Sequence, residues 1–298
     1  MTLPRQVLPK TFYLLTRRCT QRMFLLLPDE ETNNAFVYCL AEAAERFAIE
    51  LIASQQMSNH HHTVLFDRQG RVVEFMAHFH KMLAKCQNSY RGRWENMWST
   101  EQPCLVELEE KSDVIDKIVY TATNPVLDNL VERVHHWPGA KLVKAMLQQE
   151  PLRAHRPAHF FQEDGLMPET VELRFVIPPE LGDAAEVIEE VRTLIAKTEQ
   201  DEARKRSERG SRVLGRREIL RQSWRDSPTS REPRRNLRPR VAARSKWHRI
   251  AALSRNAEFL SAYRAARAAW LTAKPILFPP GTYWLARFAN APVFEFSN

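Results

Sequence analysis

The chain has 298 residues, of which 44% are apolar and 27% charged, as in ordinary soluble proteins with one or two cored domains. It has only 8 glycines and no G-x-x-x-x-G-K or G-x-G-x-x-G motif, which argues against nucleotide cradles built on glycine-rich turns. No stretch approaches the ~20 apolar residues of a membrane span. The first ten residues lack the apolar core of a signal peptide, so we expect a cytoplasmic protein that does not enter a membrane.

The formal net charge of +8 is unevenly distributed along the chain. Residues 204–246 contain 16 Lys and Arg against 4 Asp and Glu, so this segment carries +12 and the remainder −4. A basic segment on a near-neutral body indicates a polyanionic partner, most simply nucleic acid. The alternative is a solvated linker without a partner, and the prolines and arginines of residues 223–244 favour irregular structure there.

Apolar periodicity predicts seven elements in the first half of the chain, in the order strand, helix, strand, strand, helix, strand, helix. The two central strands are joined by a short polar segment and form an expected hairpin. The first six elements have the split βαβ, or ferredoxin-like, order, which predicts an α+β domain with an antiparallel sheet and helices on one face. The expected elements are residues 11–16, 30–47, 48–53, 60–66, 71–88, 104–108 and 113–122.

Asn124-Pro125 is expected to end the last of these helices, and a short helix should follow up to residue 134. The second half predicts a strand at 171–177, a long helix capped by Asp183, a helix at 256–273 and a strand at 282–288. These elements form a mainly helical, basic C-terminal extension. The expected division is a core of residues 1–150, a strand–helix extension 151–200, a basic linker 201–248 and a small C-terminal module 249–298.

The chemically most informative segment is the histidine-rich strand, which contains His60, His61 and His62. Residues two apart on a strand point the same way, so His60 and His62 present two imidazoles at ~6–7 Å backbone spacing. That arrangement suits two ligands of one divalent ion, and imidazole is more acceptable to manganese than to magnesium. Two structural histidines are the alternative, and a metal site needs a third ligand from elsewhere.

Three segments together resemble the REP-associated and insertion-sequence tyrosine transposases of the HUH endonuclease superfamily. The sequence MSNHHHTV at 57–64 resembles that family's M-P-N-H-x-H strand. YLLTRRCTQRMF at 13–24 resembles its first strand, and YTATNPVLDNLVE at 120–132 resembles its Y-I-x-x-N-P-V-x-x-G-L-V segment. The likeness covers about residues 10–140 and keeps the order and spacing of the motifs.

The resemblance implies a metal-assisted reaction on single-stranded or hairpin DNA. A tyrosine hydroxyl attacks a phosphodiester and forms a phosphotyrosine, which preserves the bond energy for rejoining, and Mg²⁺ or Mn²⁺ polarises the scissile phosphate. Such a protein acts as a monomer or a homodimer.

The same resemblance directs attention to the helix after the histidine strand as the source of nucleophile and third ligand. Asn88 stands at the ligand position, but Ala84 stands one turn earlier in place of a tyrosine, which leaves Tyr90 as the expected nucleophile. His80 shares that helix face, as a further ligand, a proton shuttle or an ordinary helix histidine. The arginines expected to contact DNA phosphates are Arg17, Arg18, Arg91 and Arg93.

Two other functions remain open at this level. Ala84 favours a protein of the same fold that recognises DNA hairpins without cutting them. A metal-dependent hydrolase of another substrate, which uses a metal-bound water and no tyrosine, is the other alternative. A covalent protein–DNA adduct distinguishes the transposase-like reaction from both.

Overall fold

The computed structural model describes residues 4–230 and 239–294. At its centre is a five-stranded sheet in the order β2-β3-β1-β4-β7, in which the first four strands are antiparallel and β7 joins β4 in parallel. This confirms the ferredoxin-like order. The sheet strands are β1 (Thr11–Arg18), β2 (Ile49–Gln56), β3 (His60–Asp67), β4 (Cys104–Leu108) and β7 (Val241–Ala242).

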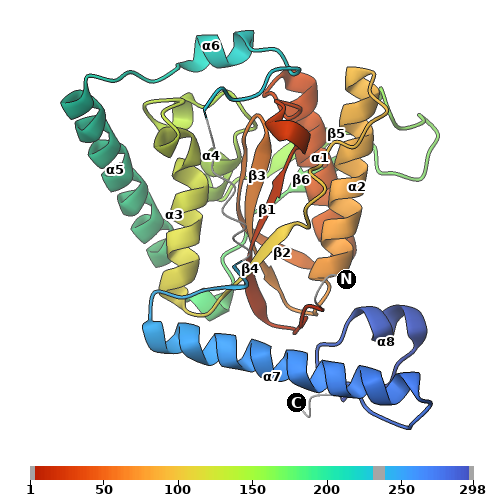
Figure 1. The fold of residues 1–298 in the computed structure, drawn as a ribbon. Helices are drawn as coiled ribbons and strands as arrows, with labels where there is room; N and C mark the ends of the chain where they lie inside the picture. Colours follow the sequence, from red (N-terminus) through yellow and green to blue (C-terminus); the bar gives the residue numbers. More distant parts are fainter. Residues whose placement is uncertain (1–3, 231–238, 295–298) are drawn as a thin grey trace.

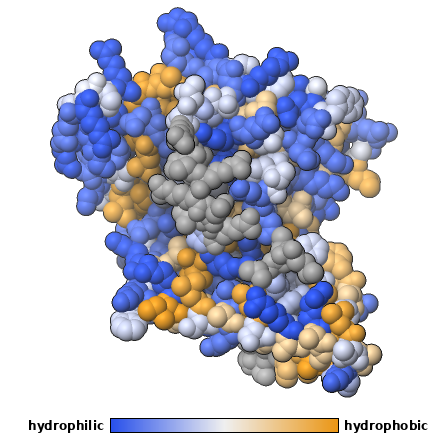
Figure 2. All heavy atoms as spheres, viewed as in Figure 1, coloured by the Kyte–Doolittle hydropathy of each residue, from blue (hydrophilic) through white to orange (hydrophobic). Residues whose placement is uncertain are grey.

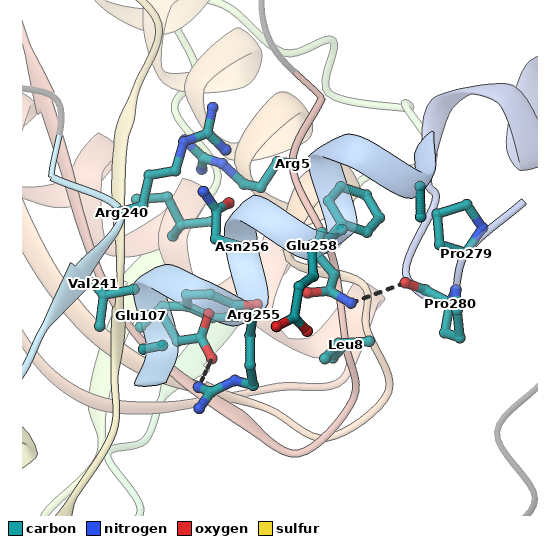
Figure 3. A pocket seen from close by; sticks show the side chains of 16 residues that line it. Arg5, Leu8, Glu107, Arg240, Val241, Arg255, Asn256, Glu258, Pro279 and Pro280 are labelled. Atoms are coloured by element: carbon teal, nitrogen blue, oxygen red, sulfur yellow. Dashed lines mark hydrogen bonds and ion pairs between the residues drawn. The ribbon is translucent and has the colours of Figure 1, made fainter. Parts of the chain in front are cut away.

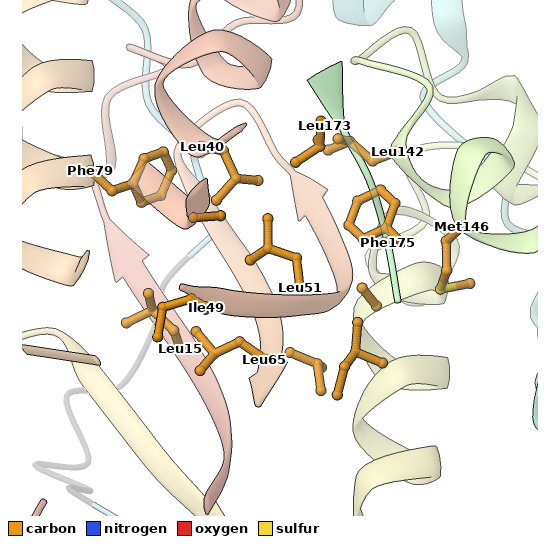
Figure 4. Close-up of a cluster of buried hydrophobic side chains, with 14 of the residues drawn as sticks. Leu15, Leu40, Ile49, Leu51, Leu65, Phe79, Leu142, Met146, Leu173 and Phe175 are labelled. Carbon is orange, nitrogen blue, oxygen red and sulfur yellow. The ribbon is translucent and has the colours of Figure 1, made fainter. Parts of the chain in front are cut away.

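Helices cover both faces of the sheet, whereas the sequence predicted helices on one face only. Figure 1 shows α1 (Glu30–Phe47) and α2 (Val72–Arg91) on one side and α3 (Lys111–Leu127) on the other, with α5 (Ala184–Arg209) outside α3. The core on the α1–α2 side combines Leu15, Leu51 and Leu65 of the sheet with helix residues such as Leu40 and Phe79 (Figure 4). The sheet is therefore buried on both faces, and side chains of either face can form a site with the helix that covers it.

Local capping explains why the helices begin where they do. The Asp29 carboxylate accepts a hydrogen bond from the Thr32 amide (2.8 Å), and the Asp67 carboxylate accepts from the amides of Arg71 and Val72 (2.9 and 2.8 Å). Helix α2 ends at Gly92, which has φ of 60° and so adopts the left-handed conformation that closes a helix. The turn from β3 into α2 is thus fixed by side-chain acceptors.

Helix α3 does not end at Asn124-Pro125, which corrects the sequence expectation. It runs to Leu127 with Pro125 in its last turn, and the Asp128 amide still donates to the Asn124 carbonyl at 3.0 Å. Proline removes a single intrahelical hydrogen bond there, which the remaining turn and the buried packing of Val126 offset. The expected short helix up to residue 134 does not form: residues 128–133 are turns and irregular backbone, and a single 3-10 turn, η2 (Val134–His136), follows them.

The second half of the chain wraps around this core. Helix α5 crosses the expected border at residue 200, and in place of the expected strand at 282–288 the chain forms a helix, α8 (Trp284–Ala289). Trp284 and Phe288 stack at 4.8 Å, because a spacing of four residues brings the two rings together on one turn. The remaining elements are η1 (Thr20–Arg22), α4 (Leu142–Gln148), β5 (Leu152–His155), β6 (Thr170–Leu173), η3 (Pro179–Leu181), α6 (Arg216–Arg221), α7 (Lys246–Leu271) and α8 (Trp284–Ala289).

Helix α7 lies across one end of the sheet and forms, with α8, a separate lobe beneath the core (Figure 1). On the face seen in Figure 2, apolar side chains are frequent on this lobe, while hydrophilic residues predominate on the visible part of the core above it. Among the described residues, no helix is long and apolar enough to cross a membrane.

Candidate active site

The two histidines of the predicted pair lie on the face of the sheet that α3 covers. In the β1–β3 register His60 is opposite Arg18 and His62 is opposite Thr16, and the two rings are 4.9 Å apart between centroids. His62 is buried and His60 is half-buried. Strand alternation has therefore brought the two imidazoles to one face, as expected.

Each imidazole is oriented through its Nδ1 atom by a neighbouring side-chain oxygen. His60 Nδ1 lies 2.6 Å from Asn59 Oδ1, and His62 Nδ1 lies 2.7 Å from Thr16 Oγ1. Such partners fix the tautomer and the ring orientation of metal-binding histidines. Because the Asn59 oxygen only accepts, the tautomer of His60 that donates to it from Nδ1 carries its lone pair on Nε2, the atom that would bind a metal.

Helix α3 supplies the residues that face this pair, and sequence reasoning gave them no role. Asn124 Oδ1 is 3.2 Å from His60 Nε2, and the ring of Tyr120 is 5.1 Å from that of His62 between centroids. Tyr120 and Asn124 are one helical turn apart and so point the same way. Tyr120 is 39% exposed, which leaves it accessible to a substrate. The signal was present in the Tyr-x-x-x-Asn-Pro spacing of residues 120–125.

The donor set suits a divalent cation. Among the described residues no group of three or more His, Cys, Asp and Glu could hold a metal, so a third protein ligand here would have to be another side-chain type. The Asn124 amide oxygen is such a group. His60 Nε2 and Asn124 Oδ1 lie 3.2 Å apart, so the two atoms would be close enough to bind the same ion.

Burial sets the protonation of the site at neutral pH. Burial, followed by the charges of His60 and His61, holds the pKa of His62 well below its usual range, so its imidazole is neutral. Burial, followed by Asp128, raises the pKa of Tyr120, so its phenol keeps its proton. Lys117 Nζ lies 5.7 Å from the Tyr120 ring centroid and brings a positive charge to the rim of the site.

His61 and His80 belong to the opposite face of the sheet. His61 Nε2 lies 3.0 Å from His80 Nε2, both side chains are buried, and the indole N–H of Trp98 donates to the His80 carbonyl at 2.8 Å. His80 is therefore a core residue packed between the sheet and α2, where it cannot reach an ion held by His60 and His62.

The structure does not bring the expected ligand Asn88 or the expected nucleophile Tyr90 to the histidine pair. Both lie on α2, which covers the other face of the sheet. The Asn88 amide donates to the Glu95 carbonyl at 2.8 Å, and the Tyr90 ring packs on His159 at 5.3 Å. The local sequence does not show which helix covers which face of the sheet, so it could not separate these two residues from the histidine pair.

The four predicted DNA-binding arginines do not lie together: only one of them is on the face of the histidine pair. Arg18 lies beside His60 on the site face. Arg17 points to the opposite face, where its guanidinium is 5.9 Å from the Trp98 ring. Arg91 pairs with Asp29 and Arg93 stacks on Trp224 at 5.8 Å, so these two hold the end of α2 in place.

The basic segment begins in the last turns of α5 and continues through α6. Ile219 of α6 is buried against Met57, Val126 and Trp137, which fixes this part of the segment next to the last turn of α3. Beyond it, the Phe24 amide donates to the Asp226 carbonyl at 2.9 Å. Residues 231–238 of the predicted linker lie outside the described residues.

The solved structures that are similar to this chain include two transposases. One is a REP-associated tyrosine transposase bound to a REP hairpin, at 13% identity and a TM-score of 0.42, with 59% of this chain and 99% of that chain aligned. The other is a candidate transposase from Deinococcus radiodurans R1, at 20% identity and a TM-score of 0.29, covering 38% of this chain and 89% of that one. No family model and no curated protein matches. The function proposed below therefore rests on the geometry of the site.

Proposed function

We propose that this protein binds single-stranded or hairpin DNA and cleaves and rejoins it through a phosphotyrosine on Tyr120. One observation carries the proposal: an accessible tyrosine and an amide oxygen on α3 face a pair of oriented imidazoles on β3. Phosphodiester transfer to a protein hydroxyl needs a nucleophile beside groups that offset charge on the phosphorus. His60, His62 and Asn124 would hold a divalent metal, Mg²⁺ or Mn²⁺, which when bound polarises the scissile phosphate.

Tyr120 acts in the reaction as the attacking group. Its phenol oxygen forms a new ester bond to phosphorus, one ester oxygen of the DNA leaves with a proton, and the phenol proton passes out of the site. In the reverse step a DNA hydroxyl displaces Tyr120 and restores the diester, so the number of phosphate esters is unchanged and no nucleotide cofactor is needed. Arg18 beside His60 and Lys117 beside Tyr120 would contact the flanking phosphates.

The experiment that tests this uses end-labelled hairpin oligonucleotides with Mn²⁺ or Mg²⁺ and denaturing gels. We expect a covalent protein–DNA band with the native chain, and its loss in Tyr120→Phe, which removes only the attacking oxygen. Tyr90→Phe is the matched control and should keep the band. A band that survives in Tyr120→Phe and disappears in Tyr90→Phe would overturn the assignment.

The two other functions appear as distinct outcomes of the same gels. Retarded complexes without any covalent band, in the native chain and in all variants, would indicate a hairpin-binding protein without chemistry. Cutting that depends on metal, leaves no adduct and survives in Tyr120→Phe would indicate attack by water. Under this proposal Ala84 gives no support to the hairpin-binding alternative, because it lies on α2, away from the histidine pair.

A further inference from the structure

A cavity lies on the face of the sheet opposite the histidine pair, and residues near the N-terminus line it together with residues 240–280. Its volume is about 480 Å³, and we call it the α7 pocket. Its walls are Arg5, Gln6 and Leu8, residues of β1 and β4, the start of β7, one side of α7 and the turn at Pro279-Pro280 (Figure 3). Tyr13 and Glu107 of this wall share the sheet face of His61, so the α7 pocket faces away from His60 and His62.

The walls are joined by specific contacts between distant parts of the chain. The Val7 amide donates to the Gly281 carbonyl at 3.0 Å, and the Gln6 side-chain amide donates to the Pro280 carbonyl at 3.0 Å. A Cβ on Gly281 would lie 2.6 Å from Gln6 Cγ, so the two segments approach as closely as backbone permits. The cavity is thus a built feature between packed segments.

One end of the α7 pocket is cationic. Figure 3 shows Arg5 and Arg240 next to each other there. Within residues 4–230 and 239–294, neither guanidinium pairs with a carboxylate, and the hydrogen bond of Arg240 is to the Pro4 carbonyl at 3.2 Å. Burial, followed by the charge of Arg240, lowers the pKa of Arg5, and burial lowers that of Arg240. Two half-buried like charges side by side form a favourable place for an anion.

The other end of the α7 pocket has a different chemistry. Arg255 is neutralised there by Glu109 at 2.6 Å, with Glu107 at 3.8 Å, so it adds no free cation. Glu107 and Glu258 offer carboxylate acceptors, and Asn256 lies between the two ends with an amide (Figure 3). Tyr13 and Phe259 provide apolar surface along the side. A ligand that fits has an anionic group at one end, a flat apolar body and hydrogen-bond donors at the other.

We propose that the α7 pocket binds one nucleotide, with its phosphate on Arg5 and Arg240 and its base along Phe259 toward Glu107. A mononucleotide fits a cavity of this size, since small-ligand pockets range from ~300 to ~1,000 Å³. The guanidiniums match phosphate oxygens, and amino groups of a base match the carboxylates. The nucleotide is either free or the phosphorylated end of a DNA strand. The proposal does not depend on the histidine site, because binding here needs none of its residues.

The test measures binding of the four deoxynucleoside monophosphates, the matching nucleosides and a 5′-phosphorylated oligonucleotide to the full chain by calorimetry. We expect at least one monophosphate to bind, and its nucleoside to bind at least ten-fold more weakly. Arg5→Gln/Arg240→Gln should weaken monophosphate binding at least ten-fold. Arg264→Gln is the matched control, because Arg264 is an exposed arginine of α7 outside the pocket. Arg240→Gln alone is the second variant if the double variant unfolds.

Each outcome decides the proposal. An equal loss for the phosphorylated oligonucleotide assigns the pocket to a strand end, and a loss confined to the mononucleotides assigns it to a free nucleotide. No binding at millimolar concentrations would overturn the proposal. Nucleoside affinity equal to that of the monophosphate would do so too, as would unchanged affinity in a folded arginine variant.

Discussion

The imidazoles of His61 and His80 meet nitrogen to nitrogen, Nε2 to Nε2 at 3.0 Å, in the core between the sheet and α2. One ring donates and the other accepts, so the hydrogen bond is lost when both rings are protonated. Protonation of the first ring already places an unfavourable buried charge in the core. Burial holds the pKa of both groups well below the usual value for histidine. The contact therefore makes the fold sensitive to acid.

We expect the free energy of unfolding to fall as the pH is lowered from neutral. The pKa values of His61 and His80 are lower in the folded chain than in the unfolded chain. Below about pH 6.5 the unfolded chain therefore binds protons on these two residues that the folded chain does not bind. Stability is fully present above that pH and is lost below it, by at most ~1.4 kcal/mol per pH unit for each group. Urea unfolding at several pH values measures this. His61→Leu/His80→Leu should show a shallower dependence, and an unchanged slope would exclude these two residues as its cause.

Replacing Thr16 by valine should weaken metal binding without touching a proposed ligand. The substitution keeps the shape but removes the hydroxyl that lies 2.7 Å from His62 Nδ1. Loss of such an orienting partner typically lowers metal affinity ~10–100-fold. Titration with Mn²⁺ followed by electron paramagnetic resonance gives the affinity. Thr170→Val, on the exposed strand β6, should bind Mn²⁺ as the native chain does.

Asn124→Ala should weaken Mn²⁺ binding more strongly than Asn88→Ala does. Asn124 Oδ1 lies 3.2 Å from His60 Nε2, whereas Asn88 bonds to Glu95 on the far side of the sheet. A ligand that binds only the native fold raises the melting temperature, so at one Mn²⁺ concentration the rise should be smaller for Asn124→Ala than for the native chain and Asn88→Ala. If Asn88→Ala weakened Mn²⁺ binding and Asn124→Ala did not, the third ligand would have to be Asn88 of α2.

Gly281→Ala should destabilise the protein more than Gly215→Ala. Both glycines have left-handed backbone, with φ of 82° and 86°, so both substitutions carry the backbone cost of ~1 kcal/mol or more. Only at Gly281 does a Cβ also meet other atoms, 2.6 Å from Gln6 Cγ and 3.0 Å from Leu8 Cδ2, while nothing lies within 4 Å at Gly215. Denaturant unfolding compares the two, and equal losses would show that the α7 lobe is not held at this contact.

The sequence correctly predicted the helices and strands in which apolar residues recur with one clear periodicity. The alternation of β3 placed His60 and His62 on one face, and the polar residues before it predicted the β2–β3 hairpin, which the register confirms. Short segments were harder. Trp284 and Phe288 fit a strand pattern and a single helical turn equally well, and the structure has the helix because four-residue spacing stacks the two rings.

The sequence by itself determined the ferredoxin-like order, the shared face of the histidine pair and the basic character of the C-terminal half. Those features depend on neighbours along the chain and on side-chain chemistry. Only the tertiary structure decided which helix meets the histidines. Strand alternation separates two faces without saying what covers each, and the packing of α3 rather than α2 on the His60 face brought Tyr120 and Asn124 to the site and left Tyr90 and Asn88 behind the sheet.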